Sequence, residues 1–505
     1  MATQQEYSER LLPLLSEGLE PHVLSASPEQ VFSIEALAGT LGEILEELEK
    51  QHIGASAHVQ ALVDEQPIEP WDGHGELAFL LYFLHNPPAT LREEIDALPE
   101  LRIVWDAMAA VAAPSPFTPA LFNTLSASLP TQANVKCNQW GDIYGTGKYE
   151  LLDTGWAWTL KNDLMNHMPK WLGKGYGIAN FVTHDWKVPI KLKPGSGDKV
   201  TIAIIGDWGS GKYTLSGLAN KNGPAIAVMD TLKQLPTPPD YLIHLGDTYY
   251  SGTGPNRSPK NEEAHNLIDM LKHYPSIAKP GHCFTLNSNH EMYGGAYGYF
   301  DVALANPLFS SQKGCSYFAM EYEDWIIAGI DSAYFDPSIM YMDGGLGKKS
   351  KDPQYDFLKQ IKASGKKSIV MSHHTGLSTD GASPSKYLWK NVNSEIKPAF
   401  WYWGHIHLGV AYSSNAYSGN MNTRCIGHSS MPFAIPPGMA GCQKNIDWYA
   451  DTPLDSTQAL QAVYYTRQRA KNGFAILTLS KSGITEEIYE IGNVNPVWKN
   501  QQNAK

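Results

Sequence analysis

Short apolar runs in the second half of the chain constrain its fold more than any other feature. The strand-like runs lie at 201–205, 241–245, 325–330, 368–371 and 399–403. Helix-like segments at 225–235 and 261–273 separate several of them. Alternation of this kind predicts an α/β layered domain in which helices cover the sheet faces. Segments 474–479 and 485–491 are expected as closing strands.

Polar clusters that can bind metal ions follow these runs. They are Gly206-Asp207-Trp208-Gly209, Gly246-Asp247-Thr248-Tyr249-Tyr250, Ser288-Asn289-His290-Glu291, Ser372-His373-His374 and Gly404-His405-Ile406-His407. The carboxyl ends of strands in an open α/β sheet meet at one edge, where ligands bind. We therefore expect the five clusters to converge on one place.

The residue types in these clusters suit two adjacent hard or borderline cations. Carboxylates, imidazoles, an amide oxygen and a phenolate favour Fe, Mn or Zn over thiolate-seeking ions. A carboxylate can bridge two metal ions, and Asp247 is the natural candidate. Glycines at 206, 246 and 404 let the backbone turn sharply beside such ions. Two ions about 3.5–4 Å apart clamp a phosphoryl group and lower the pKa of a bound water to ~7.

The order GDxG, GDxxY, NHE, VxxH and GHxH resembles that of the calcineurin-like metallophosphoesterases, and within them the purple acid phosphatase branch. The resemblance spans residues 207–407. It implies a metallophosphoesterase β-sandwich of two mixed sheets flanked by helices. The strand pattern by itself does not distinguish this sandwich from a doubly wound sheet.

The resemblance also implies a role for each matching residue. The first metal ion would be held by Asp207, Asp247, Tyr250 and His407. The second would share Asp247 and add Asn289, His373 and His405. His290 would contact the phosphate and assist the leaving group, with Glu291 orienting it. The expected metal pair is iron with zinc, manganese or a second iron. A metal-bound hydroxide would attack the phosphorus of a phosphomonoester.

Two positions favour the tyrosine-containing branch. Gly209 stands where most of the superfamily has a histidine ligand, and Tyr250 stands three residues after Asp247. Tyr249 competes with Tyr250, and we expect Tyr249 to pack in the core. A ferric ion bound to a phenolate would give a visible charge-transfer band.

Departures from the family pattern concern the substrate. Ser288 replaces the usual glycine before Asn-His, and the later histidines of plant-type members have no counterpart. We assign His374 to part of their catalytic role. His428 is a candidate substrate contact, although packing in the core is the better explanation. A small or lipid-derived phosphodiester is therefore an alternative substrate, and an inactive scaffold is a third hypothesis.

Composition limits the molecules that the chain can bind and the compartment that suits it. The formal charge of −12, without basic clusters, disfavours nucleic acid and leaves a small phosphorylated substrate. The five scattered cysteines suit a reducing compartment. We find neither a signal peptide nor a membrane span, which predicts a cytoplasmic protein.

The predicted organisation has four parts. Residues 1–130 are expected as a helical accessory domain, with helices after Ser27 and Thr90. Residues 131–197 form a transition segment packing on the core, 198–492 form the metallophosphoesterase domain, and 493–505 form a tail. Residues 206–213 imitate a nucleotide-binding P-loop, but Tyr213 replaces the magnesium-binding Ser or Thr.

Overall fold

The computed structural model describes most of the chain from residue 177 to 503. Within that range it leaves out 213–222, 256–260, 337–340, 416, 432–438, 440–443, 455–462, 465–466 and 469. In the N-terminal region it describes 87, 89–97, 102, 105, 136–137, 143–144, 149 and 155–167. No helix among these described residues is long and apolar enough to cross a membrane.

The chain divides into two compact units. The first comprises residues 1–69 and 73–178, and the second comprises residues 70–72 and 179–505. The described elements of the first unit are α4 (Ala89–Asp96), α7 (Gly155–His167) and a small ladder of β1 (Lys136–Cys137) and β2 (Ile143–Tyr144). Helix α4 confirms the helix predicted near Thr90, whereas the helix predicted after Ser27 lies outside the described residues.

An eight-stranded mixed sheet forms one layer of the second unit. Its order is β13 (Ile446–Tyr449), β11 (Gly409–Tyr412), β12 (Asn422–Ile426), β10 (Phe400–Trp403), β9 (Lys367–Met371), β8 (Trp325–Gly329), β7 (Phe318–Tyr322) and β3 (Ile190–Lys191). Strands β8, β9, β10 and β12 run parallel, and antiparallel pairs flank them.

A six-stranded mixed sheet forms the other layer. Its order is β18 (Trp498–Asn503), β17 (Gly483–Glu490), β16 (Gly473–Ser480), β4 (Lys199–Ile205), β5 (Tyr241–His244) and β6 (Cys283–Thr285). Strands β4, β5 and β6 are parallel, and β16 pairs antiparallel with β4. A separate ladder joins β14 (Val463–Tyr464) to β15 (Arg467–Gln468).

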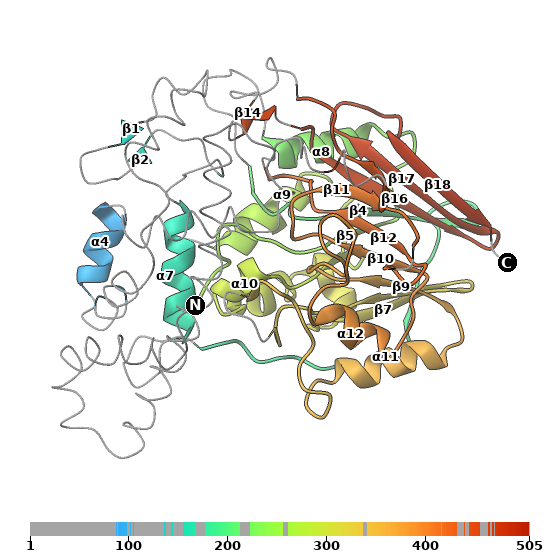
Figure 1. Cartoon of the computed structure of the whole chain (residues 1–505), viewed down its shortest axis with the longest axis horizontal. Helices are drawn as coiled ribbons and strands as arrows, with labels where there is room; N and C mark the ends of the chain where they lie inside the picture. The colour runs from blue at the N-terminus through green and yellow to red at the C-terminus, as the bar shows by residue number, and fades with distance from the viewer. Residues whose placement is uncertain are drawn as a thin grey trace. The chain divides into compact units, whose positions relative to one another are not determined.

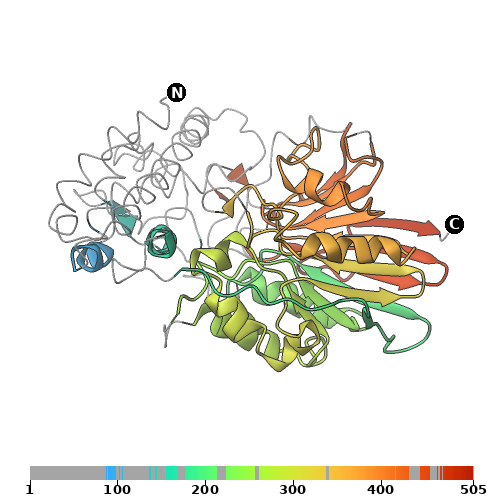
Figure 2. The same cartoon turned by 90° about the horizontal axis from the view of Figure 1, so that it is seen from below.

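Helices cover the sheets and connect the strands. They are α8 (Pro224–Gln234), the π-helical η2 (Glu263–Ile268), α9 (Asp269–Lys272), α10 (Asn289–Tyr293), the π-helical η3 (Tyr299–Ala303), the 3-10 helix η4 (Pro307–Gln312), α11 (Gln354–Ala363) and α12 (Leu388–Asn393). Helices α11 and α12 lie along the eight-stranded sheet in both views (Figures 1 and 2). Proline at the first position of α8 fixes the backbone angle that a helix start requires.

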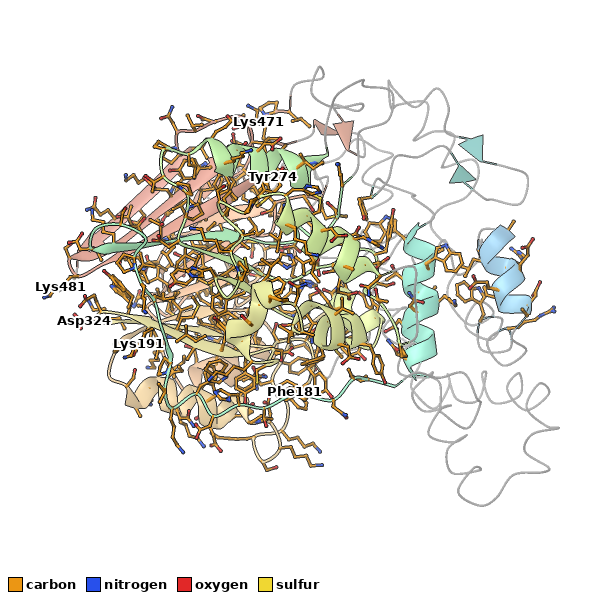
Figure 3. All side chains as sticks on the ribbon, turned by 180° about the vertical axis from the view of Figure 1, so that it is seen from behind. Phe181, Lys191, Tyr274, Asp324, Lys471 and Lys481 are labelled. Atoms are coloured by element: carbon orange, nitrogen blue, oxygen red, sulfur yellow. The ribbon has the colours of Figure 1, made fainter. Side chains whose placement is uncertain are left out.

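The two sheets pack face to face. Strand β12 contacts β16, and apolar side chains from both sheets form one core that includes Ile202, Trp401 and Leu477. The turns of the β7–β8 and β16–β17 hairpins, marked by Asp324 and Lys481 in Figure 3, lie together at one end of this sandwich. Strand pairing places the carboxyl ends of β4 and β9 at the opposite end.

The observed architecture confirms the predicted sandwich of two mixed sheets flanked by helices. Two boundaries differ from the prediction. The second unit begins at Ala179 rather than at residue 198, since β3 pairs with β7. The predicted tail at 493–505 includes β18, which pairs with β17 along its whole length.

Candidate metal centre

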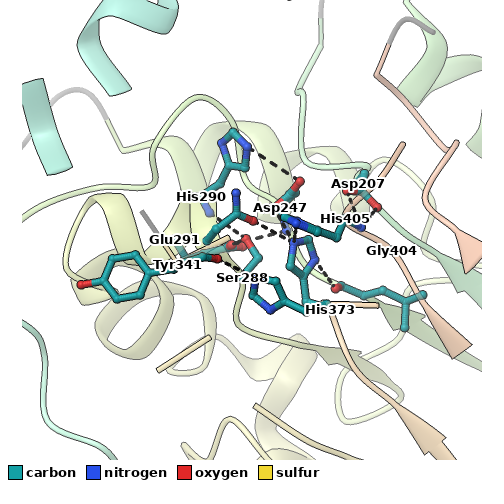
Figure 4. A network of polar contacts seen from close by, with 12 residues as sticks. Asp207, Asp247, Ser288, His290, Glu291, Tyr341, His373, Gly404 and His405 are labelled. Carbon is teal, nitrogen blue, oxygen red and sulfur yellow. Dashed lines mark hydrogen bonds and ion pairs between the residues drawn. The ribbon is translucent and has the colours of Figure 1, made fainter. Parts of the chain in front are cut away.

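Carboxyl ends of strands from both sheets supply the predicted site residues. Asp207 follows β4, Asp247 follows β5 and Asn289 begins α10 just after β6. From the other sheet, His373 follows β9, while His405 and His407 follow β10. Figure 4 shows His373 and His405 close to Asp247, as the sequence predicts. The sandwich therefore joins residues that are far apart in the sequence.

Four of these residues have left-handed backbone conformations. The φ angles are +55° at Asp207, +78° at Asp247, +71° at His405 and +50° at His407. Non-glycine residues seldom adopt this region, and each such strain costs about 1–3 kcal/mol. The surrounding fold must hold these turns, which is typical of positions that aim functional groups.

Gly246 illustrates how tightly the turns pack. Its φ is +105°, and a Cβ atom there would lie 2.8 Å from His373 Nδ1 and 2.9 Å from Ser288 Cβ. Any larger residue would displace both neighbours. The glycine is therefore required for close approach of the β5 turn to His373.

Around His373, four atoms converge that can only accept hydrogen bonds. His373 donates Nδ1–H to the Leu245 carbonyl over 2.9 Å, and His405 donates Nε2–H to the Met342 carbonyl over 3.1 Å. The opposite nitrogens of both rings are then unprotonated in the neutral forms. His373 Nε2 lies 2.8 Å from Asn289 Oδ1, 3.2 Å from Asp247 Oδ1 and 3.2 Å from His405 Nδ1.

These acceptor atoms repel one another unless a cation lies between them. The amide of Asn289 is oriented independently, because Nδ2 donates to the Tyr293 hydroxyl over 3.0 Å. His373, Asn289 and Asp247 are almost completely buried, so water does not screen the repulsion. The donor set fits a metal ion bound by nitrogen and oxygen ligands.

A second group of potential ligands lies on the other side of Asp247. Asp207, Asp247 and His407 offer ligand atoms within 4.8 Å of one another. His407 Nε2 lies 3.5 Å from Asp207 Oδ1 and 3.6 Å from Asp247 Oδ2. The two oxygens of Asp247 thus face different groups, as the prediction of a bridging carboxylate requires.

The Tyr249 phenol lies beside this group, whereas Tyr250 is the predicted ligand. The Tyr249 hydroxyl lies 2.7 Å from Asp247 Oδ2 and 3.0 Å from His407 Nε2. Tyr250 instead contributes its main-chain carbonyl, which accepts a short hydrogen bond from His290 Nδ1. Tyr249 is buried as expected, but its hydroxyl lies among the predicted ligands.

Electrostatics favour an ionised Asp247. Burial opposes ionisation, yet the facing His290 holds the pKa of this carboxyl well below its ordinary value. Burial lowers the pKa of His373 to about 3, so its ring remains a neutral potential ligand at ordinary pH. Both protonation states are those that metal binding requires.

Glu291, which is predicted to orient His290, contacts residues of two turns. Its carboxylate accepts hydrogen bonds from the Thr248 hydroxyl over 3.0 Å, from the Asp247 amide over 3.3 Å and from the Ser288 hydroxyl. Burial, followed by the charge of Asp247, raises the pKa of Glu291 to about 8. Glu291 therefore braces the turn after β5, and the Tyr250 carbonyl orients His290.

His374 and His428 have structural surroundings. His374 Nε2 donates to the Tyr341 carbonyl over 2.7 Å, and Nδ1 lies 2.9 Å from the Ser332 hydroxyl. Although His374 groups with His373 and His405, both of its ring nitrogens are engaged. The ring of His428 is buried against Gly409 and Gly473. Packing accounts for these contacts, and the catalytic role of His374 and the substrate contact of His428 stay predictions.

Sequence reasoning missed two residues beside the site. The adjacent tyrosines were the only signal for Tyr249, and their order after Asp247 favoured Tyr250. Met342 contacts Asn289 and His405, but it lies in a loop without a recognisable motif. Only the folded chain brings that loop to the strand ends.

Comparison with known proteins agrees with this geometry. Residues 200–409 match the family model for calcineurin-like phosphoesterases. No curated protein matches the chain.

Similar solved structures share little sequence with the chain. "GAP50 the anchor in the inner membrane complex of Plasmodium" is 14% identical, with 61% of this chain and 90% of that chain covered and a TM-score of 0.41. The structure of PhoD is 11% identical, with 62% and 70% covered and a TM-score of 0.36. Vacuolar Protein Sorting 29 from Cryptosporidium parvum is 10% identical, with 61% and 98% covered and a TM-score of 0.25. The family match, together with the clustered ligands, identifies a calcineurin-like phosphoesterase domain in this chain, the domain of a phosphoester hydrolase.

Proposed function

We propose that the chain is a binuclear metallohydrolase of the purple acid phosphatase type that acts on phosphomonoesters. The convergence of acceptor atoms from Asp247, Asn289, His373 and His405 carries this proposal. A second ion would be held by Asp207, Asp247 and His407. Such a pair of ions lowers the pKa of a bound water and neutralises charge on the phosphoryl group.

We place a phenol ligand at Tyr249 rather than Tyr250. The Tyr249 hydroxyl already lies beside Asp247 and His407. Gly209 supports the tyrosine-containing branch, since a Cβ atom there would lie 2.4 Å from the Asp247 carbonyl oxygen. The histidine that most of the superfamily has at this position does not fit here.

The proposed role of His290 is to hold a proton near the leaving group. Its Nδ1–H is fixed by the Tyr250 carbonyl, and its Nε2 lies 3.9 Å from Asp247 Oδ2. A protonated ring in this place donates from Nε2 toward an oxygen bound next to Asp247. Buried surroundings strengthen this interaction because water is excluded.

The proposal is tested by metal analysis, a visible spectrum, and rates on matched phosphomonoesters and phosphodiesters. We expect two metal ions per chain, iron with zinc, manganese or a second iron, and faster turnover of monoesters. Iron-free active protein without a charge-transfer band would contradict the purple acid phosphatase assignment. Faster turnover of diesters would favour the alternative substrate class with the same centre.

A further inference from the structure

Met342 lies between two of the proposed ligands of the ion beside His373. Its carbonyl oxygen accepts the Nε2–H of His405 over 3.1 Å. Its sulfur lies 3.6 Å from Asn289 Nδ2 and 3.4 Å from the Tyr293 hydroxyl. Met342 therefore contacts one ligand on α10, which follows β6 of the six-stranded sheet, and one ligand that follows β10 of the eight-stranded sheet.

Both contacts determine which atom each ligand presents. Because His405 donates Nε2–H to Met342, its Nδ1 is unprotonated and faces His373 Nε2. Because Asn289 Nδ2 is directed at Met342 and Tyr293, its Oδ1 faces His373. Partners of this kind fix the tautomer and orientation of metal ligands.

Hydrogen bonds to buried residues hold the loop that carries Met342. The Tyr341 carbonyl accepts from His374 Nε2 over 2.7 Å, and the Gly344 amide donates to Asp336 Oδ2 over 2.6 Å. The Gly345 amide donates to the Ser332 carbonyl over 2.9 Å. At the exposed edge, Lys386 pairs with Asp343 over 3.0 Å.

Met342 and His405 lie on the more exposed side of this group of ligands. Met342 and His405 are half-buried, whereas Asn289 and His373 are almost completely buried. Figure 4 shows the Tyr341 side chain directed away from the cluster, so its main chain makes the contact with His374.

We propose that Met342 is a positioning residue that sets the affinity of the metal ion bound by Asn289, His373 and His405. This inference rests on the proposed binuclear function. The thioether and the carbonyl pre-orient Asn289 and His405 before the ion binds, and His374 and Asp336 hold the loop in place. Loss of the thioether removes one partner of the Asn289 amide and the sulfur contact of the Tyr293 hydroxyl that also holds this amide, so the amide is less firmly oriented and the site binds its ion more weakly.

The test is titration of the metal-free chain with Zn²⁺ by calorimetry. We expect two sites in the wild type. In Met342→Ala, the site that contains His373 should weaken roughly 10–100-fold while the other is unchanged, as is usual for lost outer contacts of metal ligands. Asp336→Ala should act in the same direction, because it releases the Gly344 amide.

Two controls locate the effect. Lys386→Ala removes the exposed pair with Asp343 and the contact with the Tyr387 ring, neither of which involves Met342, and it should leave both affinities unchanged. In a His373→Ala background, which lacks the affected site, Met342→Ala should not alter the remaining site. Unfolding temperatures of all variants check that the fold is intact.

The outcomes separate this inference from the proposed function. A wild type that binds fewer than two Zn²⁺ ions would contradict the binuclear centre. A wild type that binds two ions, with both affinities retained in Met342→Ala, would overturn the role of Met342 alone. If Met342→Ala instead weakened Zn²⁺ binding at the site that contains His407, that result would also overturn the role of Met342.

Discussion

Single residues in the candidate centre are arranged by their hydrogen-bond capacity. His373 and His405 each donate from one ring nitrogen to a main-chain carbonyl. The other nitrogen of His373 faces Asp247 and Asn289, and that of His405 faces His373. Glu291 holds the Asp247 amide, so the carboxyl that lies between the two ligand groups is fixed from its own backbone. Acceptors brought together in this way require a cation for stability.

The two adjacent tyrosines provide a prediction at the residue scale. Tyr249→Phe should abolish a phenolate-to-iron charge-transfer band and weaken metal binding at the site that contains His407. The reason is that the Tyr249 hydroxyl lies beside Asp247 and His407. Tyr250→Phe should keep the band, since its contact with His290 comes from the main chain. A visible spectrum of both variants decides this, and loss of the band only in Tyr250→Phe would refute the assignment.

His428 provides a pH-dependent prediction. Burial lowers its pKa from 6.5 to about 3. Below pH 6.5 the unfolded chain therefore binds a proton that the folded chain excludes, and stability falls as the pH falls toward 3. Between pH 6.5 and 5 this single group should remove about 1.6 kcal/mol.

Urea unfolding of the metal-free chain at both pH values measures this effect. His428→Gln should reduce the fall in stability between the two pH values by about the same 1.6 kcal/mol, whatever its effect at neutral pH. An unchanged pH dependence in that variant would show that His428 does not carry the effect.

At the scale of elements, one buried ion pair links the two sheets. Arg424 on β12 donates from Nε and Nη2 to the two oxygens of Glu486 on β17, each over 2.9 Å. Tyr402 on β10 donates to the same carboxylate over 2.5 Å, and Arg424 also stacks on Trp498 of β18. Both charged groups are almost fully buried, so each depends on the other.

Breaking this pair should destabilise the sandwich strongly. Glu486→Gln leaves a buried arginine charge uncompensated, and we expect a loss of about 3–5 kcal/mol in the free energy of unfolding. The double variant Arg424→Met with Glu486→Leu should lose less than either single variant. Denaturant unfolding measures both, and additive losses in the double variant would argue against coupling.

The elements also show where sequence reasoning succeeds and fails. Strands β4, β5, β8, β9 and β10 were predictable because each is a short apolar run that ends at a glycine or at a polar cluster. Strand β18 was not, because Trp498-Lys-Asn-Gln-Gln-Asn lacks an apolar face and lies at the sheet edge. Its pairing with β17 depends on tertiary contact.

The candidate site was likewise predictable in part. Asp207, Asp247, Asn289, His373, His405 and His407 lie in local motifs directly after strands, so their convergence follows from the topology. The choice between Tyr249 and Tyr250 depends on how the turn after β5 is folded against Glu291. The role of Met342 depends on a loop that reaches the site only through His374 and Asp336.

For the whole molecule, the fold places residues from both sheets at one end of a sandwich. The shared core and the Arg424–Glu486 pair hold the sheets together, and Asp247 lies where the two ligand groups meet. We therefore propose that Asp247 connects two metal ions in a single hydrolytic centre.

The most direct test of this claim is to measure metal content and phosphomonoester turnover together in the wild type and in Asp247→Asn. The account predicts two ions in the wild type and at most one in the variant. Turnover of the variant should fall by more than the roughly 10–100-fold that is typical of a lost outer partner. An Asp247→Asn chain that keeps two ions and wild-type turnover would contradict the account.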